Sequence, residues 1–414
     1  MRRVATFLIL AAAGVLPAAA ADPPKTGDAA TIRIATFNSS LNRTAPGALQ
    51  RDLSTPDNAQ ARIVAEIIQR VRPDILLLQE FDYDAGGASL KLFESNYLGR
   101  SQNGSAPIQF KYHFFTESNT GVPSGLDLDN DGRVAGGADA LGFGEFPGQY
   151  AMMLLSRFPI DEARVRTFRK FLWRDMPDAR LPDDPATAAP ADWYSDVELA
   201  ALPLSSKSHW DVPIRIGKRK LHVFASHPTP PAFDGPEDRN GLRNHDEVRF
   251  WNDYIAGEKY SRDDKGKSGG FKSGQFIVMG DLNSDPVDGA SLKDAIRSLL
   301  ENPRVNASVT PSSPGGAKAA AQGGMNASQT GDARLDTADF YDRTVGNLRV
   351  DYLLPSKDVT ICAAGVFWPG EKEPDARLVW GEPPPSSDHR LVWIDVNVAS
   401  GQCPPGSDPT TRAP

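Results

Sequence analysis

The feature that most constrains the fold is a series of short apolar runs, most of which end in a polar residue. Residues 31–37 (TIRIATF) alternate polar and apolar side chains as a strand does, and residues 74–78 (DILLL) and 275–279 (QFIVM) have the length of buried strands. Glycine and proline are abundant, with 36 and 34 residues, and they favour loops and strand ends over long helices. The chain is therefore expected to fold around short buried strands whose polar ends meet along a common rim.

Two segments have helical periodicity. Residues 57–71 repeat apolar side chains at four-residue spacing until Pro73 stops the helix, and residues 242–255 carry a second apolar face. Further strands are predicted over residues 151–156, 212–216, 221–226, 349–354 and 391–398. Residues 82–148 are predicted to be rich in loops, residues 174–197 to form an irregular surface excursion, and residues 302–331 to form a flexible insertion. Short strands among helices indicate an α/β fold of two packed sheets flanked by helices.

The N-terminus has the layout of a secretory signal peptide. Two arginines precede an apolar stretch that is too short to span a bilayer comfortably, and small residues then lead into a polar segment. The alternative is a membrane anchor, although no later stretch is apolar enough to cross a membrane. We predict a signal peptide over residues 1–21 with export to the periplasm or the exterior, one domain over residues 30–400, and a disordered Pro-rich tail over residues 401–414.

The chain has two cysteines, Cys362 and Cys403. In an exported protein they are either a disulfide that ties the tail to the last strands, or two unpaired thiols. Their spacing is no metal-binding signature.

The net charge of −8 and the pI near 5.4 bear on the partner. They do not favour a protein that coats nucleic acid non-specifically, because such binding needs clustered Lys and Arg. They do not exclude a nuclease, since a bound metal and a local basic rim can offset overall acidity. The expected partner is nucleic acid or another phosphodiester substrate; the sequence identifies no protein partner.

Polar residues suited to chemistry lie at or beside the predicted strand ends. They are Asn38, Glu80, His227, Asp281, Asn283, Asp351, Asp388 and His389. A hard cation such as Mg²⁺ takes carboxylate oxygens and leaves positions open for phosphate, and Glu80 suits it. Asp281 can orient and deprotonate a water.

The remaining residues supply the other groups that phosphate-ester hydrolysis needs. Asn283 and His389 can offset the charge that develops on phosphorus, and His227 can protonate a leaving oxygen. Asp351 can fix the tautomer of a histidine. Each residue alone is also typical of a turn or of a structural hydrogen bond, but together they predict a phosphoesterase.

The order of these segments resembles the endonuclease/exonuclease/phosphatase superfamily, which includes deoxyribonuclease I, exonuclease III and the sphingomyelinases. ATFN, LLLQE, GQYAMMLLSRFPI, FASHPTPP, VMGDLNSDP, RVDYLLPS and SSDHRLV occur in that family's order and span almost the whole chain after the first 31 residues. The resemblance implies a four-layer α/β/β/α sandwich, with two mixed sheets between helices. It also implies a divalent cofactor, Mg²⁺, with Mn²⁺ or Ca²⁺ as alternatives because all three are hard cations that prefer oxygen.

The resemblance also implies a metal site. Asn38 and Glu80 look like its metal-site pair, and Asp388 resembles the additional acidic residue near the metal.

The same resemblance implies catalytic roles. Asp281 resembles the water-activating aspartate and Asn283 the phosphate-binding asparagine. His389 looks like the C-terminal catalytic histidine, with Asp351 as its carboxylate partner.

One segment departs from the pattern of deoxyribonuclease I. His227 and Pro230 resemble its H-x-x-P, but that enzyme orients this histidine with a glutamate just before the central strand. Here Gly148 and Gln149 occupy the corresponding region, and the nearest acid is Glu145. The role of His227 as a general acid is therefore less firmly implied than the role of His389.

Two further segments have open interpretations. Arg239, Arg243 and Asn244 begin a predicted helix after an unusual polar run, so they are either substrate-binding residues or a solvated helix start. In the run 127–132, Asp127, Asp129, Asp131 and the glycine that follows resemble the start of a calcium loop. Its closing glutamate is missing, and an acid stands one residue late at position 139, so the alternative is an acidic turn.

Three functions remain open from the sequence. A nuclease is the leading hypothesis, and an enzyme acting on phospholipids or small phosphoesters is the nearest alternative. A lipid enzyme calls for an exposed apolar tip, for which residues 171–173 (FLW) are a candidate unless they belong to the core. A non-catalytic binding module is disfavoured, because such a module should have lost parts of the metal and histidine set.

Overall fold

The structure is a computed structural model that describes residues 31–399 and 401–403. The predicted signal peptide and most of the predicted tail lie outside these residues. Within them, no helix combines the length and the apolar character that a membrane crossing requires.

The strands form two large sheets and a small third one. The six-stranded sheet has the order β12-β13-β1-β2-β4-β3 and contains β1 (Ile32–Leu41), β2 (Ile75–Phe81), β3 (Tyr112–Phe115), β4 (Met153–Ser156), β12 (Thr360–Val366) and β13 (Val392–Asn397). The five-stranded sheet has the order β11-β8-β7-β6-β5 and contains β5 (Arg166–Thr167), β6 (His209–Ile216), β7 (Arg219–Ser226), β8 (Gln275–Asp281) and β11 (Asp351–Pro355). The small sheet pairs β9 (Ala338–Asp339) with β10 (Asn347–Leu348). Both large sheets are mixed, because β1 pairs β2 and β7 pairs β8 in parallel while their other neighbours are antiparallel.

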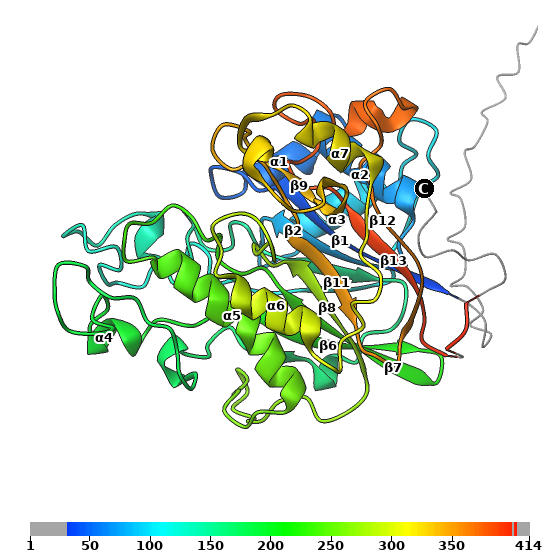
Figure 1. The fold of residues 1–414 in the computed structure, drawn as a ribbon. Coiled ribbons are helices and arrows are strands. Elements are labelled where there is room, and N and C mark those ends of the chain that lie inside the picture. Colours follow the sequence, from blue (N-terminus) through cyan, green and yellow to red (C-terminus); the bar gives the residue numbers. More distant parts are fainter. Residues whose placement is uncertain (1–30, 400, 404–414) are drawn as a thin grey trace, which may run out of the picture.

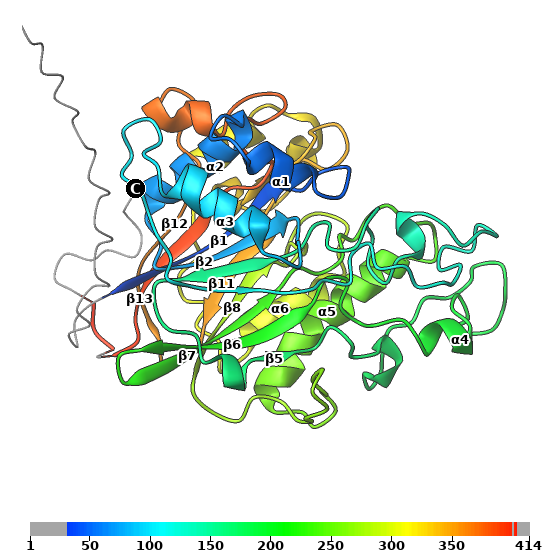
Figure 2. The same ribbon diagram turned by 180° about the vertical axis from the view of Figure 1, so that it is seen from behind.

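Helices cover the outer faces of both sheets. The α-helices of the described residues are α1 (Ala48–Leu53), α2 (Ala59–Val71), α3 (Ala88–Phe93), α4 (Asp196–Leu199), α5 (Arg239–Ala256), α6 (Lys293–Glu301) and α7 (Pro314–Ala320). Figures 1 and 2 show the sheets packed face to face, with α1, α2 and α3 beyond one sheet and α5 and α6 beyond the other. The predicted four-layer sandwich of two mixed sheets between helices is confirmed.

The second sheet divides its side chains between two cores. On β7, Val223 and Ala225 face the core between the sheets, while Phe224 faces the core under α5 and α6. On β8, Ile277 and Met279 face the core between the sheets, while Phe276 and Val278 face the core under α5 and α6. This two-residue alternation is what a strand buried on both faces requires, and it explains why these runs are almost continuously apolar.

The structure corrects the sequence prediction at one segment and adds elements to it. Residues 302–331 were predicted as a flexible insertion, but they contain α7, whose Ser313 N-cap accepts a hydrogen bond from Gly316. The close packing of Gly315 against Trp368 leaves no room for a Cβ, so this segment is built into the fold. Helix α6 and strand β12 were not predicted.

Cys362 and Cys403, which are 41 positions apart in the sequence, form a disulfide. This selects the paired alternative over two free thiols. The bond attaches the segment after β13 to β12, which is an edge strand of the six-stranded sheet.

The Cys362→Ser, Cys403→Ser double variant is expected to lose about 2–4 kcal/mol of unfolding free energy, because the unfolded chain gains the freedom that the crosslink removes. Urea unfolding with and without a reductant measures this. The reductant should reproduce the loss in the wild-type protein and have no effect on the variant. Equal stability of all four samples would contradict the prediction.

Candidate active site

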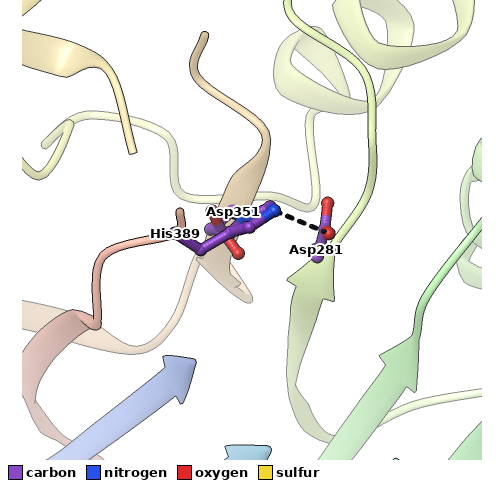
Figure 3. Close-up of side chains that lie close together, drawn as sticks. All are labelled: Asp281, Asp351 and His389. Carbon is purple, nitrogen blue, oxygen red and sulfur yellow. Dashed lines mark hydrogen bonds and ion pairs between the residues drawn. The ribbon is translucent and has the colours of Figure 1, made fainter. Parts of the chain in front are cut away.

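A histidine between two aspartates lies where strands of both sheets end. Asp281 closes β8, Asp351 opens β11, and His389 stands in the loop before β13 (Figure 3). His389 Nδ1 lies 2.9 Å from Asp351 Oδ2, and its Nε2 lies 3.6 Å from Asp281 Oδ2. All three side chains are buried. The predicted partnership of Asp351 with His389 is thus present as a contact.

The electrostatics of this trio favour charge separation. Burial by itself disfavours the His389 cation, but Asp351 and Asp281 outweigh burial and hold the pKa of His389 well above its usual value. Burial likewise disfavours the Asp281 anion, but His389 and His227 outweigh it and lower the pKa of Asp281. The site therefore holds an imidazolium beside a carboxylate at neutral pH.

Thr337 orients Asp351, and the sequence analysis did not identify it. Its Oγ1 donates to Asp351 Oδ2 at 2.8 Å and accepts from the backbone N–H groups of Val350 and Asp351, each at 3.0 Å. Thr337 lies in an irregular segment before β9, with no periodic pattern around it. No sequence feature could have identified it as part of the site.

Asp281 owes its position to the glycine before it. A Cβ on Gly280 would lie 2.0 Å from the carbonyl oxygen of Ser226, so only glycine lets β8 approach β7 this closely. Asn38, within β1, donates from Nδ2 to Asp281 Oδ2 at 3.1 Å. The close approach and this hydrogen bond fix the carboxylate between the two sheets.

His227 contacts the same carboxylate oxygen as His389, with Nε2 3.3 Å from Asp281 Oδ2. Burial, reinforced by Lys207, lowers its pKa to about 4. Its Nδ1 has no hydrogen-bond partner among the described residues, and Gln149 is instead engaged with Arg43 and Glu145. His227 is therefore neutral at pH 7, which does not suit the general-acid role predicted for it; His389 is the protonated imidazole of the site.

A second group of oxygens adjoins this trio. Asn38 Nδ2 donates to Glu80 Oε1 at 3.1 Å as well as to Asp281, and Asn42, which the sequence analysis missed, donates to Glu80 Oε2 at 2.7 Å. Burial first, and then the charge of Asp388, raise the pKa of Glu80. Asp388 itself accepts from Ser40 Oγ at 3.2 Å.

These residues fit a divalent cation. Among the described residues no Lys or Arg forms an ion pair with Glu80 or Asp388, and the repulsion between the Glu80 and Asp388 carboxylates is offset in part by the nearby His389. Carboxylate and amide oxygens are the ligands that Mg²⁺ prefers. Asp281, Asp351 and His389 also offer atoms within 4.8 Å of one another, but Asp351 already engages His389 Nδ1. The ligand set of Asn38, Glu80 and Asp388 stays a prediction.

Asn283 borders the site in a strained conformation. Its φ is +50°, its N–H donates to Asp281 Oδ1 at 2.9 Å, and its Nδ2 donates to the carbonyl of Pro228 at 3.1 Å. Such strain persists only where surrounding contacts impose it. The backbone of Asn283 is thus held against Asp281 and its side-chain amide against Pro228, and its phosphate-binding role stays a prediction.

The three residues predicted at the start of α5 do not line the site. Arg243 donates to the carbonyls of Leu204, Leu141 and Pro203, which occupy its guanidinium. Asn244 Nδ2 donates to the carbonyls of Thr229, Leu282 and Asn283 and so supports the loop that carries Asn283. Arg239 pairs with Glu237. Backbone carbonyls from other segments engage Arg243 Nε and Nη2 and Asn244 Nδ2, which speaks against the substrate-binding prediction for both residues.

In the predicted calcium loop, the aspartates that lie close together are not the three that were predicted. Asp127 and Asp129 gather with Asp139, the late acid, and Asp131 is not part of the group. Both oxygens of Asp127 and both of Asp139 already accept backbone N–H groups. The loop is closed by its own hydrogen bonds, and the calcium site stays a prediction.

Comparisons with known proteins identify the family of this chain. The sequence model of the Endonuclease/Exonuclease/phosphatase family matches residues 35–389. No curated protein matches the sequence. Similar solved structures include an endonuclease/exonuclease/phosphatase from Beutenbergia cavernae DSM 12333 (16% identity, 89% of this chain and 71% of that one, TM-score 0.45) and sphingomyelinase C from Streptomyces griseocarneus (14% identity, 88% and 99%, TM-score 0.42). Another is the human Nocturnin catalytic domain (14% identity, 88% and 94%, TM-score 0.42). Because the family match spans most of its length, the chain belongs to the endonuclease/exonuclease/phosphatase family.

Proposed function

We propose that this chain is an exported, divalent-metal-dependent phosphodiesterase and that its substrate is nucleic acid. The family consists of hydrolases that act on phosphoester bonds and use divalent metals. The observation that carries the proposal is the ionised Asp281 set between His389, with its Asp351 partner, and the oxygen group around Glu80. Water attack on phosphorus needs a positioned base, a proton donor and compensating positive charge, and this arrangement supplies or accommodates each.

The chain's own residues account for most of the mechanism. Asp281 orients the attacking water and accepts its proton, since Asn38 holds one of its oxygens and its lowered pKa keeps it ionised. His389 donates its Nε2 proton to the leaving ester oxygen as the P–O bond breaks, while Asp351 fixes Nδ1 as the donor on the other side of the ring. Asn283 donates to a phosphate oxygen. A divalent cation held by Asn38, Glu80 and Asp388 would neutralise charge on the phosphate.

Two observations favour nucleic acid as the substrate. One is the resemblance around His227, and the other is that the apolar tip expected of a lipid enzyme is absent at residues 171–173. His227 and Pro230 resemble the H-x-x-P segment of deoxyribonuclease I, and His227 contacts Asp281 as His389 does. The candidate lipid-binding tip is core instead: Phe171 and Trp173 are buried, and Trp173 Nε1 donates to Asp246 at 2.8 Å. The proposal of export rests on the layout of the first 21 residues. Mass spectrometry of the periplasmic or secreted protein tests it, because cleavage of a signal peptide changes the residue at which the protein begins.

Plasmid cleavage tests the substrate. Supercoiled DNA and bis(p-nitrophenyl) phosphate are incubated in parallel with the mature protein, with Mg²⁺ or with EDTA. Plasmid cleavage that EDTA abolishes is the expected result. Turnover of the small ester alone would keep the chemistry and move the substrate to lipids or small phosphoesters. No turnover of either by folded protein with several metals would contradict the proposal.

A further inference from the structure

An exposed apolar surface lies on the β9–β10 hairpin, beside the proposed active site, and the mechanism does not use it. In the turn of the hairpin Tyr341 is 54% exposed and Val345 is 38% exposed, and Met325 in the adjoining loop is 41% exposed. Apolar side chains that are exposed as a group among polar neighbours mark a surface that binds a partner. We call these three side chains and Arg343, which stands in the same turn, the hairpin platform.

Hydrogen bonds fix the two loops that carry the platform. The N–H of Met325 donates to the carbonyl of Asp342 at 2.7 Å, and the N–H of Val345 donates to the carbonyl of Tyr341 at 3.0 Å. A Cβ on Gly324 would lie 2.3 Å from the carbonyl oxygen of Asp342, so the loops pack as closely as glycine allows. The platform is therefore formed before a partner binds, which lowers the entropic cost of binding.

The hairpin is continuous with the proposed active site. Ala338, in β9, forms a β-bridge with His389, and the ring of Phe340 packs edge-on against the His389 imidazole, with 5.2 Å between the ring centroids. Tyr341 is the next residue in the chain. The platform therefore begins one residue beyond a side chain that contacts the proposed catalytic histidine, where a group that flanks a bound phosphodiester can reach it.

The chemistry of the platform suits a planar aromatic ligand. The guanidinium carbon of Arg343 lies 5.9 Å from the centroid of the Tyr341 ring. Arg343 pairs with no carboxylate among the described residues, so its charge is available to a ligand. Nucleobases stack on exposed aromatic rings of proteins, and a neighbouring arginine adds a cation–π contact.

The charges around the platform distinguish between two partners, the bases of a nucleic acid and a lipid surface. Burial raises the pKa of Asp339, although Arg390 opposes this. The charges of Asp342 and Glu382 raise that pKa further, so the surroundings of the hairpin are acidic. Acidic surroundings repel an anionic membrane. An unpaired base carries no charge, and a single strand can turn its bases towards the platform and its phosphates away from it. Unpaired bases are therefore the better fit.

We propose that the hairpin platform binds the unpaired bases of a single-stranded nucleic acid, with Tyr341 stacked on a base that flanks the scissile phosphate. The inference rests on the proposed function and narrows its substrate to strands whose bases are unpaired. A negatively supercoiled plasmid also offers such bases, because supercoiling favours local opening of the duplex.

An oligonucleotide without bases is the probe that tests stacking. Fluorescence anisotropy follows the binding of labelled decathymidylate, and of an abasic strand with the same number of phosphates, in EDTA so that neither strand is cleaved. The variants are Tyr341→Leu, which keeps an apolar side chain but removes the ring, and Tyr341→Phe, which keeps the ring. The control is Val197→Ala, which trims an apolar side chain that is 66% exposed on α4, away from β9 (Figure 1).

The expected result is a loss that depends on both the ring and the base. Decathymidylate should bind to Tyr341→Leu about fivefold or more weakly than to the wild type, because one stacked base contributes about 1–3 kcal/mol. Tyr341→Phe and Val197→Ala should bind it as the wild type does. The abasic strand should bind weakly and equally to all four proteins. Arg343→Gln, which should also weaken decathymidylate binding, replaces Tyr341→Leu if thermal melting shows that this variant does not fold.

Three results would overturn the proposal. One is equal binding of decathymidylate by the wild type and Tyr341→Leu, and another is equal binding of the two strands by the wild type. The third is wild-type protein that sediments with phosphatidylcholine or phosphatidylglycerol vesicles through Tyr341 while its decathymidylate binding does not depend on Tyr341. That result would make the platform a lipid-binding surface.

Activity distinguishes this inference from the proposed function. If the wild type binds decathymidylate through Tyr341 yet hydrolyses no phosphodiester in Mg²⁺, the proposed function fails and the inference stands. If the wild type cleaves DNA and Tyr341→Leu cleaves a single strand with unchanged kcat/KM and unchanged affinity, the inference fails and the proposed function stands.

Discussion

Asp281→Asn is expected to lower kcat for bis(p-nitrophenyl) phosphate by about 10³-fold, since a positioned general base contributes on the order of 10²–10⁴. The amide has the shape of the carboxylate but cannot accept the proton of water. It also presents an N–H₂ group where Asn38 Nδ2 and the two imidazoles require an acceptor. Steady-state kinetics in saturating Mg²⁺ measure the effect as a loss in kcat rather than a rise in KM.

Two controls make the result specific. Asp175→Asn removes an exposed carboxylate outside the site and should leave kcat unchanged. Circular dichroism and thermal melting establish that Asp281→Asn remains folded. A folded Asp281→Asn protein whose kcat stays within about tenfold of wild type would fall below the range for a general base and refute this role.

Asp351→Asn is expected to reduce kcat by about 10²-fold at neutral pH and to change the pH profile. In the wild type, burial disfavours the His389 cation but Asp351 and Asp281 raise its pKa, so activity that needs the imidazolium persists below that raised pKa and is lost as pH rises through it. Without the Asp351 charge the pKa of His389 falls. The alkaline limb of the profile should therefore move to lower pH.

Thr337→Val is the graded comparison for this prediction. It removes the hydroxyl that donates to Asp351 Oδ2 but leaves the carboxylate in place. The alkaline limb should move in the same direction by a smaller amount. An Asp351→Asn profile with an unmoved alkaline limb would show that the imidazolium of His389 is not the acid that limits activity.

The strand-end residues were predictable from sequence because local pattern and chemistry coincide there. Asp281 and His389 adjoin apolar runs whose burial forces them into sheets, and the ends of these strands meet, as the contacts of both residues show. The sandwich itself followed from the order of such runs. Strand β8 illustrates this, since its seven residues are all buried and end on the aspartate.

Residues that act through long-range contacts were not predictable. Thr337 lies in an irregular segment, and its partner Asp351 is brought close to it only by the tertiary fold. The same limit applies to Arg243: a charged helix start looks solvated or substrate-binding in sequence, whereas three carbonyls from other loops cover it.

Metal restoration after chelation tests the central claim most directly. EDTA-treated, dialysed wild type, Glu80→Gln and the exposed control Glu371→Gln are titrated with Mg²⁺ while the initial rate of bis(p-nitrophenyl) phosphate hydrolysis is followed. We predict no activity before addition, full recovery in the wild type and the control, and a Glu80→Gln half-saturation at least about tenfold higher, because a lost carboxylate ligand weakens a hard-cation site. Hydrolysis that survives chelation, or a Glu80→Gln curve that overlays the wild type, would contradict a metal-dependent site built on Glu80.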